Sequence, residues 1–588
     1  MTTNRLDKFA IAAVLQEIAS LLELKSGENK FKARAYRAGA RVISGYSGDL
    51  NDTIERDQLT TIRGIGNALA AQIKQLYQTG TSSVLDGLRK DFPPGVLELA
   101  TVPGLTLEKI RKLYQSLGIS SIAELKKAAE SGSLRNEKGF GVKTEAKLLE
   151  SIENRDLRAH QKDRIHIHHA QRIGTQVLDY LRTMRDFQEG SFAGSLRRST
   201  ETVGTIRVVA VTRLPATLLQ HFLRFPLIVR VVEQTENTCT VELLEGALVS
   251  IRVVPPAQYS LALLVDTGSR AHVQRLEQIA GDQNLRLDSD KLSLVSLDKA
   301  PSHPSKSEKG EAGIYAGLGM QYVPAELREN EGEVEAARKG KLPKDLIRVA
   351  DIQGMVHCHT TYSDGVNSIE EMARAAEAMG MQYLTITDHS PTAFYANGVT
   401  LDRLQRQWDE IDEVQEKVNI KLLRGTESDI VADGSLDYPD TILERFDVIV
   451  ASIHSRYKMD SDKMTKRLLT AMRQPIFKIW GHALGRLIQR RPPFECEIET
   501  VLDAISESEA AIEVNGDPYR LDLEARWIRE ARKRKIRFVI SVDAHSTGAL
   551  NNLQYGVGMA RRGWVRRGQV LNTLGTRAFM NAVRPIQQ

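Results

Sequence analysis

The chain of 588 residues is too long for one hydrophobic core, so several domains are expected. Its composition, with 41% hydrophobic and 26% charged residues, is that of an ordinary globular protein. We find no apolar run with the length of a membrane span and no signal-peptide pattern, so we expect a cytoplasmic protein with no membrane partner. The net charge of +5 permits a polyanionic partner, and a solvated surface explains it equally well. The widely spaced Cys239, Cys358 and Cys496 exclude a disulfide framework and a cysteine-based zinc site.

Short helices broken by glycine-centred turns are expected over the first 155 residues. Three turns are alike, because each places an apolar residue between small residues directly before a helix, in segments 59–73, 99–114 and 138–152. Glycine lets a backbone approach closely, and the free N–H groups at a helix start favour phosphate. One such turn is more often a corner between helices, but three turns behind the basic stretch 29–43 favour DNA binding. The residues expected to contact DNA are Gly64, Gly66, Gly104, Gly139, Gly141, Lys30, Lys32 and Arg34.

Residues 156–335 change to β-rich segments. A basic helix over 163–184 comes first, and we expect its three histidines, His166, His168 and His169, on a solvated face. No carboxylate or cysteine stands at ligand spacing from them, so a metal site is disfavoured there. Strands are expected at 205–211, 227–234, 239–245 and 248–254, followed by an amphipathic helical stretch and a polar loop at 298–313.

Together with the hairpins, three short motifs resemble the family X DNA polymerases: "GSLRR" at 194–198, "SIRVVPPAQY" at 250–259 and "TGS" at 267–269. The resemblance covers about residues 1–335 and implies a palm in which three carboxylates hold two metal ions for phosphoryl transfer. This chain has Thr205, Arg207 and Ser250 at those positions, and none of them replaces a carboxylate as a ligand. We therefore predict a degenerate palm without polymerase activity.

The nucleotide-binding frame of that palm persists as a remnant, formed by Gly194, Ser195 and Arg198. Arg207 admits two interpretations. Its guanidinium could contact DNA phosphate directly in place of a metal, or it could mark a surface that has drifted because it is no longer needed.

After residue 340, short apolar runs alternate with helical stretches, and polar residues stand at the end of each run. Buried parallel strands read as continuous apolar runs, and functional groups of α/β barrels gather at their carboxyl ends. We therefore predict a barrel of about seven βα units, with strands in 352–359, 383–389, 420–429, 446–454, 476–482, 510–516 and 537–545.

All six histidines after residue 340 fall at the ends of these runs, together with carboxylates. One histidine alone is more often structural, but ordinary histidines would have no reason to be confined to strand ends. Imidazoles and carboxylates without thiolates suit manganese, zinc or iron, and nine ligands exceed the need of one ion, so two or three divalent ions are expected, manganese or zinc above all. The predicted ligands are His357, His359, Asp364, His389, Glu427, His454, His482, Asp543 and His545.

The motifs in this half resemble the PHP (polymerase and histidinol phosphatase) domain, a distorted (β/α)7 barrel, over about residues 345–575; they include "HCHTTYSDG", "ESDIVADGSLDYPD" and "NGDPYRLDL". The resemblance implies a first ion on His357, His359, Glu427 and Asp543, a second between Glu427, His454 and His482, and a third on Asp364, His389 and His545. Glu427 is expected to bridge. Glu427, Asp543 and His359 are the predicted catalytic residues, with Arg486 as either a phosphate clamp or an ordinary salt bridge.

The predicted function is a DNA-repair phosphoesterase: a metal-dependent 3′-5′ exonuclease on gapped or 3′-ended DNA, with 3′-phosphatase and abasic-site cleavage as further activities. DNA would be the partner, held through its backbone without sequence specificity. Two alternatives stay open, a phosphatase of small monoesters and a non-catalytic scaffold that binds gapped DNA. The expected domains are a helical DNA-binding domain at 1–80, a fingers-like domain at 81–155, the degenerate palm at 156–260, a thumb-like domain with linker at 261–335 and the PHP domain at 340–588.

Overall fold

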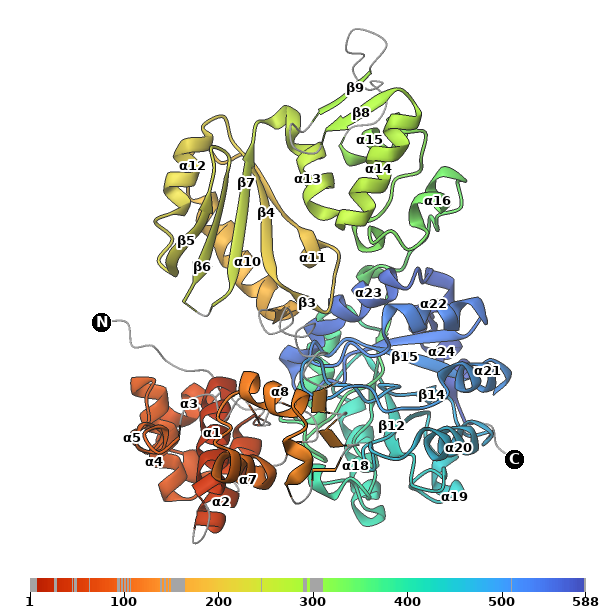
Figure 1. Ribbon diagram of the computed structural model, residues 1–588. Coiled ribbons are helices and arrows are strands. Elements are labelled where there is room, and N and C mark those ends of the chain that lie inside the picture. The colour runs from red at the N-terminus through yellow and green to blue at the C-terminus, as the bar shows by residue number, and fades with distance from the viewer. Residues whose placement is uncertain are drawn as a thin grey trace. The chain divides into compact units, whose positions relative to one another are not determined.

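The computed structural model divides into two compact units, Met1–Lys162 and Asp163–Gln588, which run from red to orange and from yellow to blue in Figure 1. This division lies close to the predicted boundary at 155/156; the other predicted boundaries stay predictions. The structure describes residues 8–25, 29–44, 46, 50–62, 64–92, 96, 99, 102, 105, 107–137, 140, 141, 144, 145, 148, 149, 164–244, 246–288, 293–296, 310–508 and 510–585.

The described part of the first unit is helical, as predicted. Two apolar cores hold it together, one around Ile18 and Leu113 and one around Leu15 and Ile73. Its helices are α1 (Lys8–Lys25), α2 (Asn29–Ser44), α3 (Leu50–Glu55), α4 (Asn67–Thr79), α5 (Ser83–Arg89), α7 (Leu107–Leu117) and α8 (Ile122–Glu130), with the short 3₁₀ turns η1 (Leu59–Thr61) and η2 (Leu134–Asn136).

The second unit begins with a five-stranded sheet in the order β2-β4-β7-β6-β5, where only β4 and β7 are parallel. Alternation along β4 gives the sheet two buried faces: Val208 packs in the core with α10 and α12, and Val209 packs in the core with α13. This confirms the predicted palm-like α+β region. The elements are α10 (Ile167–Arg182), β2 (Glu189–Ala193), α11 (Gly194–Arg197), β4 (Thr205–Val211), α12 (Pro215–Phe222), β5 (Ile228–Gln234), β6 (Thr238–Leu243) and β7 (Leu248–Val254), with β1 (Ile165–His166) paired to β3 (Thr202–Val203).

The thumb-like part follows directly, and its helices share one core that includes Leu264, Leu276 and Tyr315. Its elements are α13 (Tyr259–Thr267), α14 (Arg270–Asp282), β8 (Leu285–Asp288), β9 (Ser293–Ser296), α15 (Glu311–Gly317) and α16 (Glu333–Arg338).

Seven parallel strands in sequential order form the C-terminal barrel, as predicted. The bridge between Cys358 and Ala544 joins the two ends of the sheet, so the barrel closes next to the predicted ligands His357, His359 and Asp543. The strands are β10 (Gly354–Met355), β11 (Tyr383–Ile386), β12 (Lys421–Asp429), β13 (Val448–Ser452), β14 (Ile479–Trp480), β15 (Ala511–Asn515) and β16 (Arg537–Ser541).

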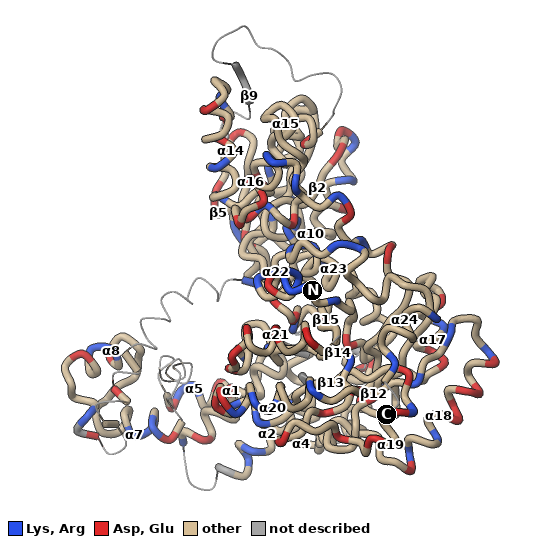
Figure 2. Tube along the Cα trace, turned by 90° about the vertical axis from the view of Figure 1, so that its right-hand side faces the viewer, with Lys and Arg blue, Asp and Glu red and all other residues tan. Residues whose placement is uncertain are grey.

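Helices follow the barrel strands and cover the outside. On α18 acidic and basic residues are interspersed, as Figure 2 shows, so this outer face has mixed charge. The helices are α17 (Ile369–Ala378), α18 (Leu401–Gln415), α19 (Asp440–Leu443), α20 (Ser461–Met472), α21 (Ile498–Ser508), α22 (Ala525–Lys533), α23 (Leu553–Arg562) and α24 (Thr576–Val583). No helix among the described residues is long and apolar enough to cross a membrane.

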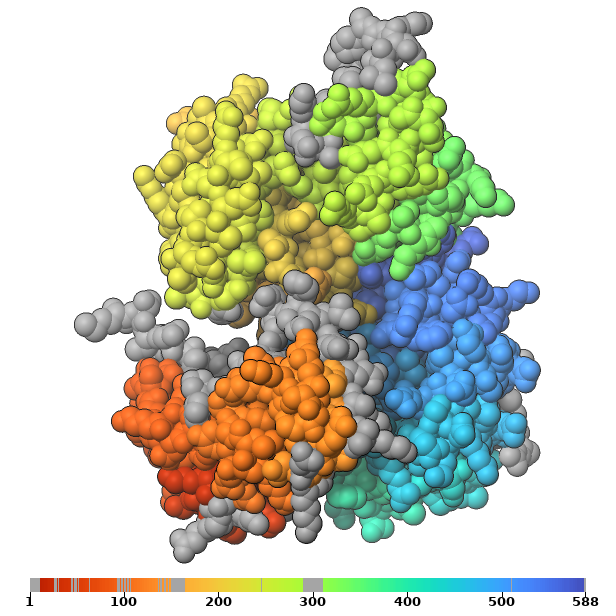
Figure 3. Space-filling view, in the orientation of Figure 1, coloured from red at the N-terminus to blue at the C-terminus, as the bar shows by residue number. Residues whose placement is uncertain are grey.

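Polar contacts join the palm and thumb to the barrel within the second unit. In Figure 3 the green end of the thumb lies against the blue α23 region, and there Arg561 makes an ion pair of 2.7 Å with Glu326. Arg562 pairs with Glu329 at 2.9 Å. Several such pairs at partly buried positions stabilise one arrangement of the two parts.

The expectation of a solvated histidine face on residues 163–184 is wrong. His166 is buried, its Nδ1 lies 3.2 Å from the carbonyl oxygen of Pro518, and its ring contacts Tyr519 of the barrel. Burial lowers the pKa of His166 to about 4 and that of His168 to about 3, so both rings are neutral. Sequence patterns could not predict this contact, because its two sides are 352 residues apart.

Candidate metal centre

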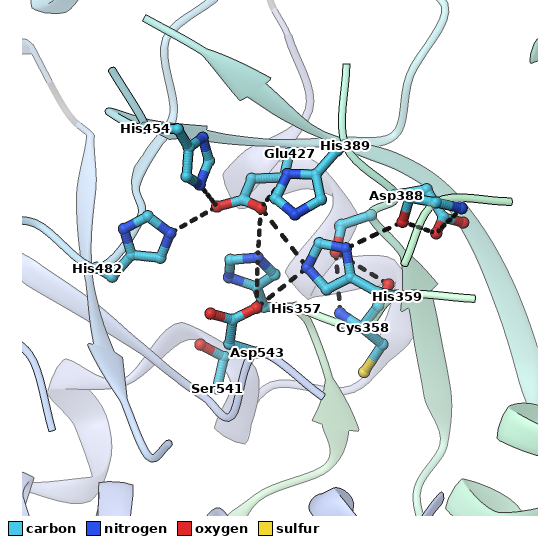
Figure 4. A network of polar contacts seen from close by, with 12 residues as sticks. His357, Cys358, His359, Asp388, His389, Glu427, His454, His482, Ser541 and Asp543 are labelled. Atoms are coloured by element: carbon cyan, nitrogen blue, oxygen red, sulfur yellow. Dashed lines mark hydrogen bonds and ion pairs between the residues drawn. The ribbon is translucent and has the colours of Figure 1, made fainter. Parts of the chain in front are cut away.

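The nine predicted ligands of the barrel come together at the carboxyl ends of its strands. Most are buried: His357, His359 and Glu427 expose at most 1% of their surface. Strands alternate their side chains, so His357 and His359 share one side while Cys358 between them points away, as Figure 4 shows. The exceptions to full burial are Asp364 and His545, which keep about a third of their side chains exposed, at 37% and 33%. The cluster therefore opens to solvent on the side of these two residues.

Glu427, at the end of β12, is at the centre of the cluster. Its Oε1 lies 2.7 Å from His482 Nε2 and 3.2 Å from His454 Nε2. Its Oε2 lies 2.9 Å from His389 Nδ1 and 3.4 Å from His357 Nε2. One carboxylate that faces imidazoles with both oxygens is placed as a bridging ligand would be.

Two further carboxylates flank Glu427. Asp543 Oδ1 lies 3.1 Å from His359 Nε2, and Asp364 Oδ1 lies 3.3 Å from His545 Nε2 and 3.6 Å from His389 Nε2. The carboxylates thus extend the cluster from the buried centre to its exposed side.

The donor set fits divalent metal ions. Buried polar atoms are normally hydrogen-bonded, yet in this cluster several have no hydrogen-bond partner among the described residues. These atoms are Nε2 of His357, His359 and His454, Nδ1 of His389 and His482, Oε2 of Glu427 and Oδ1 of Asp543. Imidazole nitrogens and carboxylate oxygens that converge without other partners are the ligand atoms that a metal ion requires.

Three groups of side chains bring their ligand atoms within 4.8 Å of one another. The first is the predicted set around His357, and the others differ from the sets implied by the family resemblance. His389 joins Glu427 and His454, where His482 was expected, and His359 joins the group around Asp364. His482 instead holds Glu427 through its Nε2. The groups are His357, His359, Glu427 and Asp543; His389, Glu427 and His454; and His359, Asp364, His389 and His545.

Buried carboxylates behind the ligands hold the rings in place, and the sequence analysis did not find them. Glu513 in β15 lies 2.6 Å from His357 Nδ1, and Asp429 lies 3.1 Å from His454 Nδ1. Such partners fix the orientation of a ligating ring and make it more basic. The signal for Glu513 was available, because a single acidic residue interrupts the apolar run "AAIEVNG".

Charges inside the cluster compensate one another. Burial would lower the pKa of His357, but three surrounding carboxylates, Glu513 foremost, raise it well above its ordinary value. Burial would raise the pKa of Glu427, but four surrounding imidazoles hold it well below its ordinary value. Burial and two neighbouring imidazoles lower the pKa of His359 to about 4. Protons on the imidazoles balance the negative charge of the carboxylates when no metal is bound, and divalent cations can replace those protons.

Arg486, predicted as a phosphate clamp or a salt bridge, makes the salt bridge. Its side chain is buried, and its guanidinium donates to Glu201 of the palm at 2.8 Å and to Glu524 at 3.1 Å. Its remaining donors bond to the backbone carbonyls of Arg520 and Leu521. All three guanidinium nitrogens of Arg486 are thus engaged by acceptors of the protein itself.

Arg520 is the arginine that reaches the cluster, and the sequence analysis missed it. Its Nε lies 3.2 Å from Asp543 Oδ2, and its Nη1 is buried without a hydrogen-bond partner among the described residues. Asp543 and Asp517 outweigh burial and raise the pKa of Arg520, so it stays charged. The "NGDPYRLDL" loop gave no spacing rule that distinguishes this arginine from Arg486.

The structure brings the three degenerate palm positions together. Arg207 on β4 is directly opposite Ser250 on β7, and Thr205 is two residues before Arg207. Arg207 is exposed, and Ser250 accepts a hydrogen bond of 3.0 Å from Thr240. Asp266, an acidic residue that lines the same pockets, accepts two contacts of 2.6 and 3.0 Å from Arg252. The residues present do not fit a metal, and every metal-type group found among the described residues lies in the barrel.

A pocket of about 750 Å³ lies beside these positions, lined by Gly194, Ser195, Arg198 and Arg207. Arg198 donates to Glu329 and to the carbonyl oxygen of Thr267, so it joins the palm to the thumb. Gly194 has φ +59°, and a Cβ there would meet the Arg207 side chain at 3.1 Å. The predicted remnant is thus assembled, with Arg198 already engaged.

The DNA-binding prediction falls only partly on described residues. In the first hairpin Gly64 has φ +96°, which favours glycine, and Gly66 precedes α4 with open space around its Cβ position. Gly141 also has open space. Lys32 and Arg34 are exposed on α2, which also carries Lys30. Gly104 and Gly139 lie outside the described residues, and nothing is described of the Lys30 side chain.

Known families match three parts of this architecture. The PHP domain matches residues 356–517, a helix-hairpin-helix domain matches residues 7–82, and the DNA polymerase beta thumb matches residues 262–329. The chain is also 35% identical over 565 residues to the DNA polymerase/3′-5′ exonuclease PolX of Bacillus subtilis strain 168, and the match covers 96% of each chain. This chain belongs to the PolX family. A probable phosphatase of Thermoanaerobacter sp. strain X514 is 27% identical over 231 residues, which are 37% of this chain and 89% of that protein.

Membership of the PolX family confirms the predicted organisation. The hairpin and thumb matches indicate DNA binding, and the PHP match together with the buried cluster supports a metal-dependent hydrolase. The PHP match ends at residue 517, so Arg520, Asp543 and His545 lie beyond it, and their distances place all three at the cluster.

Proposed function

We propose that this PolX-family protein is a 3′-5′ exonuclease that hydrolyses DNA in its PHP barrel and does not polymerise DNA in its palm. The observation that carries the proposal is the contrast between the two sites: three groups of ligand atoms converge in the barrel, and a guanidinium occupies the corresponding place in the palm. The Bacillus relative is named for both activities, and the residues of this chain support only the hydrolytic one.

Eight of the nine predicted ligands would hold two or three divalent ions, manganese or zinc, and His482 would position the shared Glu427 carboxylate. When bound, such ions lower the pKa of water and stabilise charge on a phosphoryl oxygen, which is the chemistry of phosphoester hydrolysis. Asp543 and His359 complete the group around His357, and they are the residues we assign to catalysis with Glu427.

The protein's own groups orient the reaction. Glu513 and Asp429 fix the rings of His357 and His454, so the ligand atoms are held before substrate arrives. Arg520 replaces Arg486 as the proposed phosphate contact, because its Nε lies beside Asp543 and its Nη1 has no hydrogen-bond partner among the described residues. A guanidinium suits a phosphate oxygen that gains charge in the transition state.

The hairpins would hold gapped or 3′-ended DNA through its backbone and raise the local concentration of ends at the barrel. Removal of 3′-phosphates and cleavage at abasic sites would use the same metal cluster. A role in DNA repair, in the cytoplasm where bacterial DNA lies, follows from this substrate.

The test compares hydrolysis of a 3′-labelled gapped duplex by the metal-stripped chain with manganese, zinc or magnesium added back. We expect release of nucleotides from the 3′ end with manganese or zinc. Because the barrel alone matches a probable phosphatase, the same preparations are assayed with histidinol phosphate. Turnover of histidinol phosphate without DNA hydrolysis would favour the small-monoester alternative. Binding of gapped DNA without metal-dependent hydrolysis of either substrate would favour the scaffold alternative.

A further inference from the structure

Two exposed aromatic side chains stand beside the metal cluster and are not used by the chemistry described above. Phe394 and Tyr395 expose 85% and 64% of their surfaces. They form the short 3₁₀ turn η6 (Phe394–Ala396) in the loop between β11 and α18. Two neighbouring large aromatic rings in solvent lose the stabilisation that burial would give them, which points to a partner.

The position of the rings indicates where that partner would bind. The Tyr395 ring lies 6.3 Å from the ring of His389 and 6.4 Å from the ring of His454, measured between centroids. Both histidines belong to the group around Glu427. A ligand that stacks on Tyr395 is therefore next to the site where a phosphoester would be hydrolysed.

The loop that carries the rings is fixed at both ends. Thr392 anchors one end, because its backbone N–H donates to Asp437 at 2.7 Å and its hydroxyl donates to Asp429 at 3.0 Å, and Asp429 also holds His454. At the other end, Val399 donates from its backbone to the carbonyl oxygen of His389 at 2.7 Å. The aromatic tip is thus presented on a base that is shared with the metal ligands.

The rings are also arranged so that faces stay available. Phe394 and Tyr395 meet edge to face, with 74° between their planes and 6.4 Å between their centroids. The edge of one ring is directed at one face of the other, and the remaining faces are exposed. The loop after β13 adds exposed cations, because Arg456 and Lys458 follow His454 closely. Aromatic faces beside cations are the usual combination for single-stranded nucleic acid.

We propose that Phe394 and Tyr395 form a stacking platform for the terminal bases of an unpaired DNA 3′ end, so that the enzyme acts on frayed, mismatched or single-stranded ends. This inference rests on the proposed exonuclease function and defines its substrate further. A base within a duplex is already stacked on its neighbours, so only an unpaired base gains from the platform. Stacking is tolerant of base identity, so the platform selects single-strandedness rather than sequence.

A binding experiment without catalysis tests the platform first. The full-length chain, stripped of metal, is titrated against a single-stranded oligonucleotide with 2-aminopurine at its 3′ terminus. We expect the wild type to quench the fluorophore and the double variant Phe394→Ala/Tyr395→Ala to lose most of that quenching. Site-specific quenching is the readout because the hairpin arm contributes to total affinity. Tyr395→Phe retains the ring and is expected to retain the quenching.

Leu401→Ala is the matched control, because Leu401 is half exposed in the first turn of α18 and lies outside the platform. With manganese present, the double variant should raise the KM for a mismatched 3′ end about tenfold, within the range that one stacked base contributes. It should affect glycerophosphocholine, a small phosphodiester without an aromatic ring, at least five times less.

The outcomes separate the two proposals. Quenching and KM that are the same in the double variant and the wild type would overturn the platform while leaving the exonuclease in place. An equal loss on both substrates would also overturn it, because it would show damage to the metal centre. Absence of DNA hydrolysis by the wild type, with hydrolysis of the small diester, would contradict the proposed exonuclease function itself.

Discussion

The palm and the barrel of this chain are two scaffolds of the kind used for phosphate chemistry, and they differ in the ligand atoms that they offer to a metal ion. In the barrel, unpartnered nitrogen and oxygen atoms converge around Glu427. In the palm, the backbone frame and a pocket persist, but Arg207 is opposite Ser250 where carboxylates would be needed. The two regions show that a fold does not by itself determine the chemistry, so function has to be argued from the ligand atoms present.

Loss of the bridging carboxylate should have the largest effect. Glu427→Gln keeps the size of the side chain but removes the charge that faces four imidazoles, and we expect 3′-end hydrolysis to fall by about a thousandfold or more. Metal content by mass spectrometry should fall in parallel. Glu416→Gln, on the exposed outside of the barrel, is the control. Full activity in Glu427→Gln would show that the chemistry lies elsewhere.

Replacement of Arg520 should have the next largest effect. Arg520→Lys keeps a positive charge but loses the planar guanidinium beside Asp543, and we expect kcat to fall about a hundredfold while metal content stays the same. The control is Arg537→Lys at the start of β16. An unchanged kcat would contradict the assigned phosphate contact.

The carboxylates that hydrogen-bond the ligating imidazoles should have a smaller effect. Glu513→Gln weakens the support of His357, and we expect the manganese concentration for half-maximal activity to rise about ten- to a hundredfold. Excess manganese should restore most of the activity. A loss that excess metal does not relieve would mean that Glu513 acts on folding rather than on the ligand.

The hairpin should show the smallest effect. Gly66→Ala places a methyl group in open space in the free protein but at the proposed DNA contact, so we expect an unchanged Tm and a DNA affinity about threefold weaker. Gly87→Ala in α5, which also has open space, is the control. Equal affinities of the two variants would remove Gly66 from the DNA contact.

Much of the barrel was predictable from the sequence because burial on both faces leaves continuous apolar runs, with functional residues at their ends. His357, His359 and Glu427 were found in this way. Which imidazoles form one group was not predictable, since it depends on loop geometry: His389 joins Glu427 and His454, while His482 contacts Glu427 outside that group. Arg520 and Arg486 lie in two loops with similar local patterns, and only the structure shows which one reaches Asp543.

In the palm, sequence patterns failed to predict one contact for a different reason. Strands β4, β5, β6 and β7 were predicted within one or two residues, whereas β2 was not predicted. Strands β4 and β7 bring Arg207 and Ser250 together as the family pattern implied. The burial of His166 against Tyr519 was not predictable, because it is created by the docking of two parts that are distant in the chain.

The most direct test of the central claim follows primer extension and 3′-end hydrolysis in one reaction. Wild type and His359→Ala are incubated with a labelled gapped duplex, deoxynucleotides and manganese, and product lengths are resolved by electrophoresis. We predict that the wild type shortens the primer and never lengthens it, and that His359→Ala leaves the primer unchanged. Lengthening of the primer by either protein, and above all by His359→Ala, would contradict the account.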